Sequence, residues 1–126
     1  MSDRRRSLGG FGERVAVAHL EAKGFRILDR NFRTREGEID IVAEKDGCVA
    51  FVEVRARRGE RMGSAADSIT PRKRARLLAL AQAYVQAHEG LSERQRIDVI
   101  TVSLAPDGRV LSVEHIEDAV SDASTV

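Results

Sequence analysis

The sequence predicts a single α/β domain in which helices flank a central mixed β-sheet. Its 126 residues are the length of one domain, and 42% hydrophobic and 33% charged residues are typical of a folded protein. Helical and strand patterns follow one another in the order αβββαββ. Three strands in series argue against a doubly wound sheet, so a mixed sheet flanked by helices is expected.

The chain opens with a flexible basic arm over residues 1–10, and the folded domain is expected over residues 11–116. The pattern from Phe11 to Lys23 is helical, and Gly24 stands where a left-handed residue closes a helix. A strand with apolar members is expected directly after it, up to Thr34.

A hairpin is the strongest local prediction. Two apolar strands, over residues 37–45 and 48–56, are separated by Asp46-Gly47, a dipeptide preferred in two-residue hairpin turns. Since side chains alternate along a strand, one face of this hairpin is almost purely apolar. The side chains expected on that face are Ile39, Ile41, Ala43, Ala50, Val52 and Val54.

The second helix follows a polar, glycine-containing loop over residues 59–68. Thr70 is a suitable N-cap, and Pro71 suits the first helical turn. Apolar side chains then recur at helical spacing up to about His88. This stripe consists of Leu77, Leu80, Ala81, Tyr84 and Val85.

Two further strands complete the sheet. Residues 96–104 and 110–116 have the apolar patterns of strands, and the Pro-Asp-Gly segment over residues 106–108 is a turn. Residues 117–126 form a short acidic tail. The last 20 residues hold five acids and one Arg, whereas the rest of the chain is basic.

The basic residues point to nucleic acid. The chain has 18 Arg and 3 Lys, and a guanidinium suits bidentate contacts with phosphate. A GC-rich genome would also favour Arg, but the clustering of these residues is typical of a nucleic-acid-binding surface. The expected phosphate contacts are Arg33, Arg35, Arg57, Arg58, Arg72, Lys73 and Arg76. With no Trp and one Tyr, base stacking on aromatic side chains is not expected.

Two carboxylates meet in the predicted hairpin. A two-residue turn places Asp40 directly opposite Glu53, and Glu38 opposite Arg55, on one face. Facing carboxylates repel each other, and burial adds to the cost. A Mg²⁺ ion held by carboxylate oxygens would relieve both costs. The alternative is a solvated face on which Arg55 neutralises Glu38 and Glu53.

Each helix adds one charged side chain near this pair. Glu13 shares a side of the first helix with Ala16 and Leu20, so it is expected to point at the sheet. Alternatively, it only complements the helix dipole. Lys73 lies one turn before Leu77 on the core-facing stripe, where its amine would suit a phosphate. Alternatively, it belongs to a solvated basic face.

The other chemically active side chains predict no further site. His19, His88 and His115 have no partner at metal-ligand spacing and are expected to be structural or exposed. Cys48 is expected to be a small apolar filler, and a single cysteine excludes an internal disulfide and suggests a reducing compartment. No apolar segment follows the basic N-terminus or could cross a membrane, so a cytoplasmic protein without membrane contact is expected.

Two segments resemble a known nuclease core. GEIDIVA over residues 37–43 and FVEVRAR over residues 51–57 resemble PD-(D/E)XK nucleases. More narrowly, they resemble the YraN-like bacterial family, distant relatives of archaeal Holliday-junction resolvases. That family's pattern also matches the segments over residues 12–13, 31–33, 70–73 and 97–99. Ile39 replaces the proline of the nuclease motif, and Arg55 stands where its lysine usually lies.

The resemblance implies a restriction-endonuclease-like core over residues 11–116. It implies that Asp40 and Glu53 bind Mg²⁺ or Mn²⁺, with Glu13 as a third acid and Arg55 as the catalytic cation. The implied substrate is DNA, with branched or damaged DNA as candidates. The resolvase-like relatives also suggest a homodimer.

Three functions are compatible with these observations. The first is a Mg²⁺-dependent endonuclease that hydrolyses DNA phosphodiester bonds. The second is a noncatalytic nucleic-acid-binding module that retains the nuclease fold, since Arg55 cannot usefully lose a proton. The third is a partner-binding protein whose acids and arginines pair internally. Metal-dependent stabilisation would separate the first from the other two.

Overall fold

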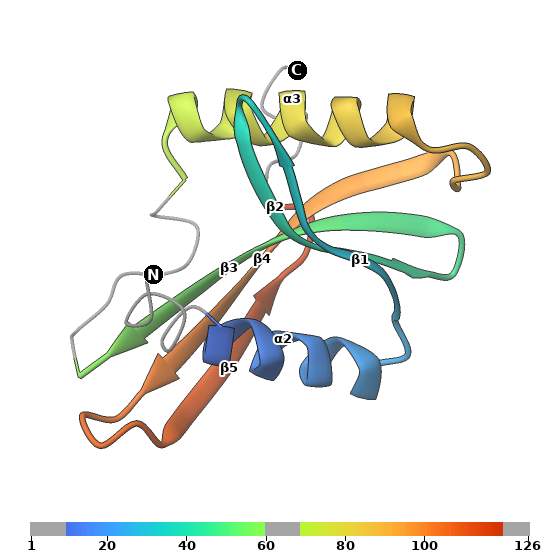
Figure 1. Ribbon diagram of the computed structural model, residues 1–126. Coiled ribbons are helices and arrows are strands. Elements are labelled where there is room, and N and C mark those ends of the chain that lie inside the picture. Colours follow the sequence, from blue (N-terminus) through green and yellow to red (C-terminus); the bar gives the residue numbers. More distant parts are fainter. Residues whose placement is uncertain (1–9, 60–68, 120–126) are drawn as a thin grey trace.

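The computed structural model describes residues 10–59 and 69–119, which form two helices and five strands (Figure 1). The predicted basic arm, most of the loop over residues 59–68 and most of the acidic tail lie outside the described residues. Within the described residues, the elements follow in the predicted order. They are α2 (Phe11–Ala22), β1 (Arg26–Thr34), β2 (Gly37–Lys45), β3 (Cys48–Arg58), α3 (Pro71–Ala87), β4 (Arg94–Leu104) and β5 (Val110–Ile116).

The strands form one mixed sheet in the order β1-β2-β3-β4-β5. Neighbouring strands are antiparallel, except that β3 and β4 run parallel. The connection between this parallel pair contains α3, since parallel strands need a long crossover. The predicted mixed sheet flanked by helices is confirmed. No helix in the described part of the chain is long and apolar enough to span a membrane.

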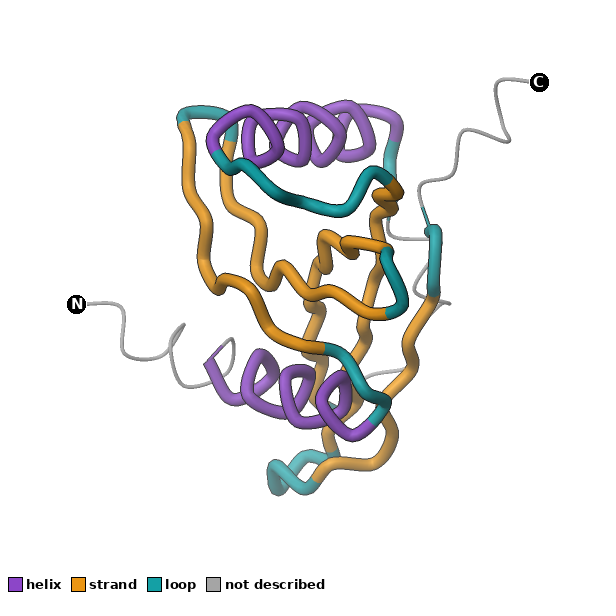
Figure 2. The backbone as a smooth tube through the Cα atoms, turned by 90° about the vertical axis from the view of Figure 1, so that its right-hand side faces the viewer, coloured by secondary structure: helices purple, strands orange, loops and turns teal. Residues whose placement is uncertain are grey.

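The two helices cover opposite faces of the sheet (Figure 2). On the α2 face, Ala16 and Leu20 pack on aliphatic side chains of β2, β3 and β4. On the α3 face, Leu77, Leu80 and Tyr84 pack on a second apolar set that includes Phe51. The central strands are therefore buried on both sides, as their nearly continuous apolar runs predict.

The predicted hairpin forms with its two-residue turn. Asp46 and Gly47 have φ values of 53° and 75°, both in the left-handed region that this turn requires. Lys45 faces Cys48 across the turn, and the antiparallel ladder continues to Ile41 and Val52. The register inferred from the sequence is therefore confirmed for the turn-proximal half of the hairpin.

Beyond Ile41, β2 separates from β3, and this corrects the predicted face-to-face pairs. The ladder ends before Asp40 and Glu53, so these acids are not register partners. Glu38 does not face Arg55 and instead pairs with Arg33 of β1. In Figure 1, the far end of the β1–β2 hairpin rises from the sheet toward α3.

The cause is a bend shared by β1 and β2. Asn31 of β1 has a φ of 60°, a left-handed conformation that Asn tolerates better than most residues. The neighbouring pairs of the ladder place Asn31 opposite Asp40. Past this point, Ile39 packs with Leu80 on the α3 face, whereas Ile41 remains on the α2 face. The prediction that Ile39 and Ile41 share a face is therefore wrong.

Candidate functional site

Asp40 lies at the point where β2 separates from β3. Its carboxylate takes the place of a β2 backbone carbonyl as hydrogen-bond acceptor for β3. Its Oδ2 accepts a hydrogen bond of 2.8 Å from the backbone N–H of Val54. Burial raises the pKa of Asp40 to about 7 against the effect of this hydrogen bond, and the charges of Glu53, Glu38 and Glu13 add to the rise. The neutral, protonated form of this carboxyl is therefore favoured relative to that of an ordinary aspartate.

Glu53 of β3 carries two cations on one oxygen. Lys73 Nζ lies 2.5 Å from its Oε2, and Arg55 Nη1 lies 3.4 Å from the same atom. The Glu53 side chain is 12% exposed, so these charges are only partly solvated. Lys73 reaches this carboxylate from the first turn of α3, where its backbone N–H donates to the capping hydroxyl of Thr70. Lys73 thus points inward, as its place on the apolar stripe predicts.

Glu13 enters the site from the first turn of α2. Gly12, directly before it, is buried, and a Cβ there would lie 2.9 Å from the Cβ of Ala56. The start of the helix therefore lies closely on β3. The Glu13 carboxylate accepts a hydrogen bond of 3.0 Å from Asn31 Nδ2 and lies 3.4 Å from Arg30 Nη2. Glu13 points toward the sheet, as its spacing predicts.

Glu13 of α2 and Glu53 of β3 therefore both lie close enough to Asp40 of β2 for their charges to act on it. Asp40 differs from the other two because it has no ion-pair partner among residues 10–59 and 69–119. In that part of the chain, no group of three His, Cys, Asp or Glu side chains is placed to hold a metal ion. The donors form an acidic centre rather than a complete protein cage.

Arginines border this centre on two sides. Arg57 and Arg58 end β3 beyond Arg55, while Arg72 and Arg76 lie on the first half of α3. Along with Arg35, these side chains form no ion pair with any described carboxylate. All are exposed except Arg57, which is half-buried.

One predicted phosphate contact is partly engaged elsewhere. The Arg33 side chain is 72% exposed, but its Nε lies 3.6 Å from the Glu38 carboxylate. Arg76, in contrast, lies along the β1–β2 turn, where a Cβ on Gly37 would lie 3.4 Å from its Cδ. The basic surface of α3 thus continues onto the turn that carries Arg35.

Sequence reasoning missed two residues of the site. Arg30 and Asn31 hold the Glu13 carboxylate, although neither was expected to have a role there. Asn31 itself could have indicated a bend in the strand, because Asn is depleted in strands and tolerates positive φ. The backbone N–H of Val54 carries no sequence signal at all.

The histidines and the cysteine lie outside this centre. The His88 ring stacks on Tyr84 at 3.8 Å between centroids, and Cys48 is buried with its thiol free. Burial, followed by the charges of Lys23 and His115, lowers the pKa of His19. The structural role expected for His88 and the filler role expected for Cys48 agree with these positions.

The fold and the site define a small α/β protein with a half-buried acidic centre bordered by arginines. The chain belongs to the family described as Uncharacterised protein family UPF0102, whose model matches residues 12–102. It is 48% identical to a UPF0102 protein of Roseiflexus castenholzii, over 98% of this chain and 100% of that protein. It is 46% identical to one of Pelotomaculum thermopropionicum, over 94% and 99% of the two chains. The matched residues include the whole acidic centre.

Proposed function

We propose that this protein is a metal-dependent endonuclease that hydrolyses phosphodiester bonds of DNA. The observation that carries the proposal is Asp40, a half-buried carboxyl with a pKa raised to about 7 beside two further acids. Such an arrangement costs folding free energy, and groups with strongly shifted pKa values cluster at functional sites. Membership in the PD-(D/E)XK superfamily, implied by the GEID and FVEVR segments, is part of this proposal.

The oxygen donors of the acidic centre suit Mg²⁺ or Mn²⁺. Mg²⁺ is usually bound through one or two carboxylates and keeps several waters, so it does not require a three-acid cage. Asp40 and Glu53 would hold the ion, and Glu13 would complete its ligands or orient a water. When bound, the ion supplies an activated water and neutralises charge that develops on the phosphate.

Lys73 and Arg55 would contact phosphate oxygens. Both contact the Glu53 carboxylate, so a metal held by this carboxylate would compete with them and free their donors for phosphate. Arg55 keeps its proton under all ordinary conditions and therefore contributes positive charge only. The lysine amine, a mobile point charge with three donors, complements it at the same carboxylate.

The bordering arginines would bind the DNA backbone. Phosphate contacts set position and orientation but carry no direct sequence information. This proposal therefore predicts a protein with weak sequence preference, for which branched or damaged DNA remains a candidate substrate. The homodimer and the cytoplasmic location both stay predictions from the sequence.

A noncatalytic nucleic-acid-binding module is the second candidate. One observation favours it: Glu13 and Glu53 already have cationic partners within the chain, Arg30 for the first and Lys73 for the second. A fold with these internal pairs does not need a metal to neutralise two of its three acids. In this case DNA binding would depend on salt but not on a divalent cation.

Thermal unfolding with added Mg²⁺ or Mn²⁺ separates the two candidates. A ligand at 100 times its Kd stabilises the folded state by about 2.7 kcal/mol. We expect this stabilisation in the wild type, its loss in Asp40→Asn, and its retention in Asp107→Asn, which changes an exposed acid far along the chain. Equal stabilisation of all three proteins, or of none, would contradict the metal site.

A further inference from the structure

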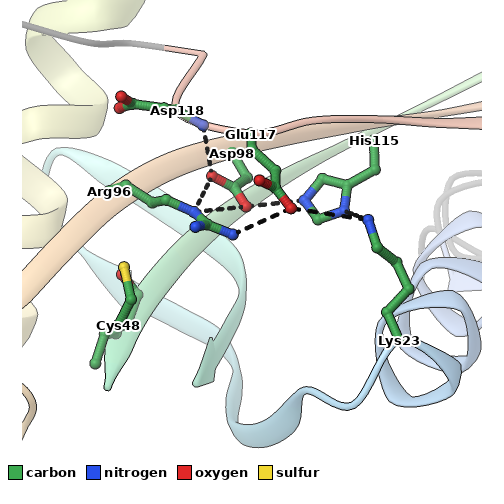
Figure 3. Close-up of polar contacts among 8 residues, drawn as sticks. Lys23, Cys48, Arg96, Asp98, His115, Glu117 and Asp118 are labelled. Atoms are coloured by element: carbon green, nitrogen blue, oxygen red, sulfur yellow. Dashed lines mark hydrogen bonds and ion pairs between the residues drawn. The ribbon is translucent and has the colours of Figure 1, made fainter. Parts of the chain in front are cut away.

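A second polar network lies at the other end of α2 from Glu13 (Figure 3). Its centre is Asp98, which is completely buried. Asp98 accepts hydrogen bonds from Arg96 Nε at 3.0 Å, from His115 Nε2 at 2.8 Å and from the Asp118 backbone N–H at 2.9 Å. Burial alone would raise the pKa of Asp98, but these hydrogen bonds lower it.

The buried carboxylate determines which nitrogen of His115 carries hydrogen. Nε2 faces Asp98 and must donate, so Nδ1 of the neutral ring is left as an acceptor. That acceptor lies 2.7 Å from Lys23 Nζ. The His115 side chain is only 2% exposed, whereas that of Lys23 is 35% exposed. Lys23 therefore lies between the buried Asp98–His115 pair and the solvent.

This environment distinguishes Lys23 from the two other lysines of the chain. Lys73 lies on the Glu53 carboxylate, and Lys45 lies 5.5 Å from the ring centre of Phe25. A carboxylate and an aromatic face both stabilise the ammonium form. Lys23 also lies 3.9 Å from the Glu117 carboxylate. Of these three lysines, however, Lys23 is the one that contacts a neutral base, His115 Nδ1, which can accept a proton from the amine. Asp98 stabilises the imidazolium that results, as in other Asp–His pairs.

The Glu117 carboxylate shows that an anionic group can lie beside the Lys23 amine. Its Oε2 lies 3.9 Å from Lys23 Nζ and 3.5 Å from Arg96 Nη2. The Glu117 side chain is 51% exposed, so it can turn into solvent. A phosphate group could then take the place of the carboxylate between the two cations.

We propose that Lys23 is a selective acylation site that accepts the acyl group of an acyl phosphate. The amine nitrogen attacks the acyl carbon, a C–N bond forms, and the C–O bond to phosphate breaks, so that inorganic phosphate leaves. Before the attack, the Lys23 ammonium gives one proton to His115 Nδ1, which passes it to solvent. As the C–O bond breaks, the nitrogen loses its second proton to the departing phosphate. The product amide has no positive charge, and its nitrogen keeps a single hydrogen.

The modification would alter the network itself. Acylated Lys23 loses its attraction to Glu117 and no longer presents an ammonium to His115. The C-terminal end of α2 then loses its polar link to β5, while Asp98 keeps all its donors. This inference does not depend on the proposed nuclease activity, because the two sites share no residue.

Incubation with acetyl phosphate, followed by mass spectrometry of each lysine over time, tests the proposal. The chain provides its own controls in Lys45 and Lys73. We expect Lys23 to be acetylated about a hundredfold faster than either, the low end of what general-base assistance provides. His115→Gln can retain an N–H donor for Asp98, because its amide nitrogen reaches the Nε2 position, but it removes the base. The Lys23 rate should therefore fall to that of Lys45.

Glu117→Gln provides a second variant at an exposed position. It removes the competing carboxylate charge, so acetylation of Lys23 should become faster while Lys45 is unaffected. An unchanged Lys45 rate in both variants also shows that the fold is intact. A Lys23 rate no higher than that of Lys45, or one that stays high in His115→Gln, would overturn the proposal.

Discussion

The carboxylate of Asp40 accepts a hydrogen bond of 2.8 Å from the backbone N–H of Val54, just beyond the point where the β2–β3 ladder ends. A side chain here takes the place of a strand carbonyl. The carboxyl is thereby held in a half-buried position that charge repulsion alone would disfavour. Asn can supply the same acceptor, so Asp40→Asn removes the charge and preserves this hydrogen bond.

Stability should fall with rising pH because of Asp40. Its pKa of about 7 in the folded protein is above the ordinary value of 3.8. Its stabilising contribution is thus complete below pH 3.8 and disappears as pH rises through 7. Between pH 5 and pH 8 the wild type should lose up to about 3 kcal/mol relative to Asp40→Asn.

Urea unfolding of both proteins at these two pH values measures the effect. His19, whose pKa is lowered by burial, titrates in both proteins and cancels in the comparison. If the difference in unfolding free energy between wild type and Asp40→Asn does not change with pH, the pKa of Asp40 is not raised in the folded protein.

Lys73→Ala should destabilise the protein. It leaves Glu53, whose side chain is 12% exposed, with Arg55 as its remaining cation at 3.4 Å. We expect a loss of about 2 kcal/mol, below the usual cost of a fully buried broken pair because some solvent reaches both groups. Arg72→Ala, one residue earlier and exposed, is the matched control and should change stability by less than about 0.5 kcal/mol. Equal effects of the two substitutions on chemical unfolding would refute the role of Lys73.

Gly12→Ala should destabilise a helix in which alanine is normally the better residue. The added Cβ would lie 2.9 Å from the Cβ of Ala56, so α2 must move away from β3. This outweighs the gain of about 1 kcal/mol expected from helix propensity. Ala56→Gly in the same chain removes the opposing methyl group and should restore stability in part. A stabilised Gly12→Ala single variant would mean that α2 does not approach β3 so closely.

Replacing Arg57 and Arg58 by Ala should weaken DNA binding for all sequences alike. If both bind phosphates, the slope of log K against log salt should decrease by roughly 0.9 for each phosphate that is no longer neutralised. Arg109→Ala is the control, because that arginine is exposed and paired with Asp107. An unchanged slope in the double variant would place the DNA on another surface.

Local signals made most of the fold predictable. The Asp46-Gly47 turn fixes the register of the β2–β3 hairpin through backbone conformation alone, and both residues have the expected positive φ. Thr70 and Pro71 mark the start of α3 for equally local reasons. These features need no knowledge of the rest of the chain.

The geometry of the site depends on contacts that are distant in sequence, and these could not be inferred. β2 leaves β3 at Asp40 because the left-handed Asn31 bends the neighbouring strand and Ile39 packs under α3. The pairing of Lys73 with Glu53 likewise depends on how α3 docks on the sheet. The sequence predicted that Asp40 and Glu53 face each other as a register pair, but the ladder ends one residue before them.

Cleavage of DNA in the presence of Mg²⁺ or Mn²⁺ tests the central claim most directly. Wild type, Asp40→Asn and Asp107→Asn would be purified in parallel and assayed on linear, nicked and branched duplexes, with and without a chelator. The acidic centre predicts metal-dependent cleavage by the wild type and by Asp107→Asn, and its loss both in Asp40→Asn and with the chelator. Absence of cleavage on every substrate, or equal cleavage by Asp40→Asn, would contradict the assignment of this site as an endonuclease centre.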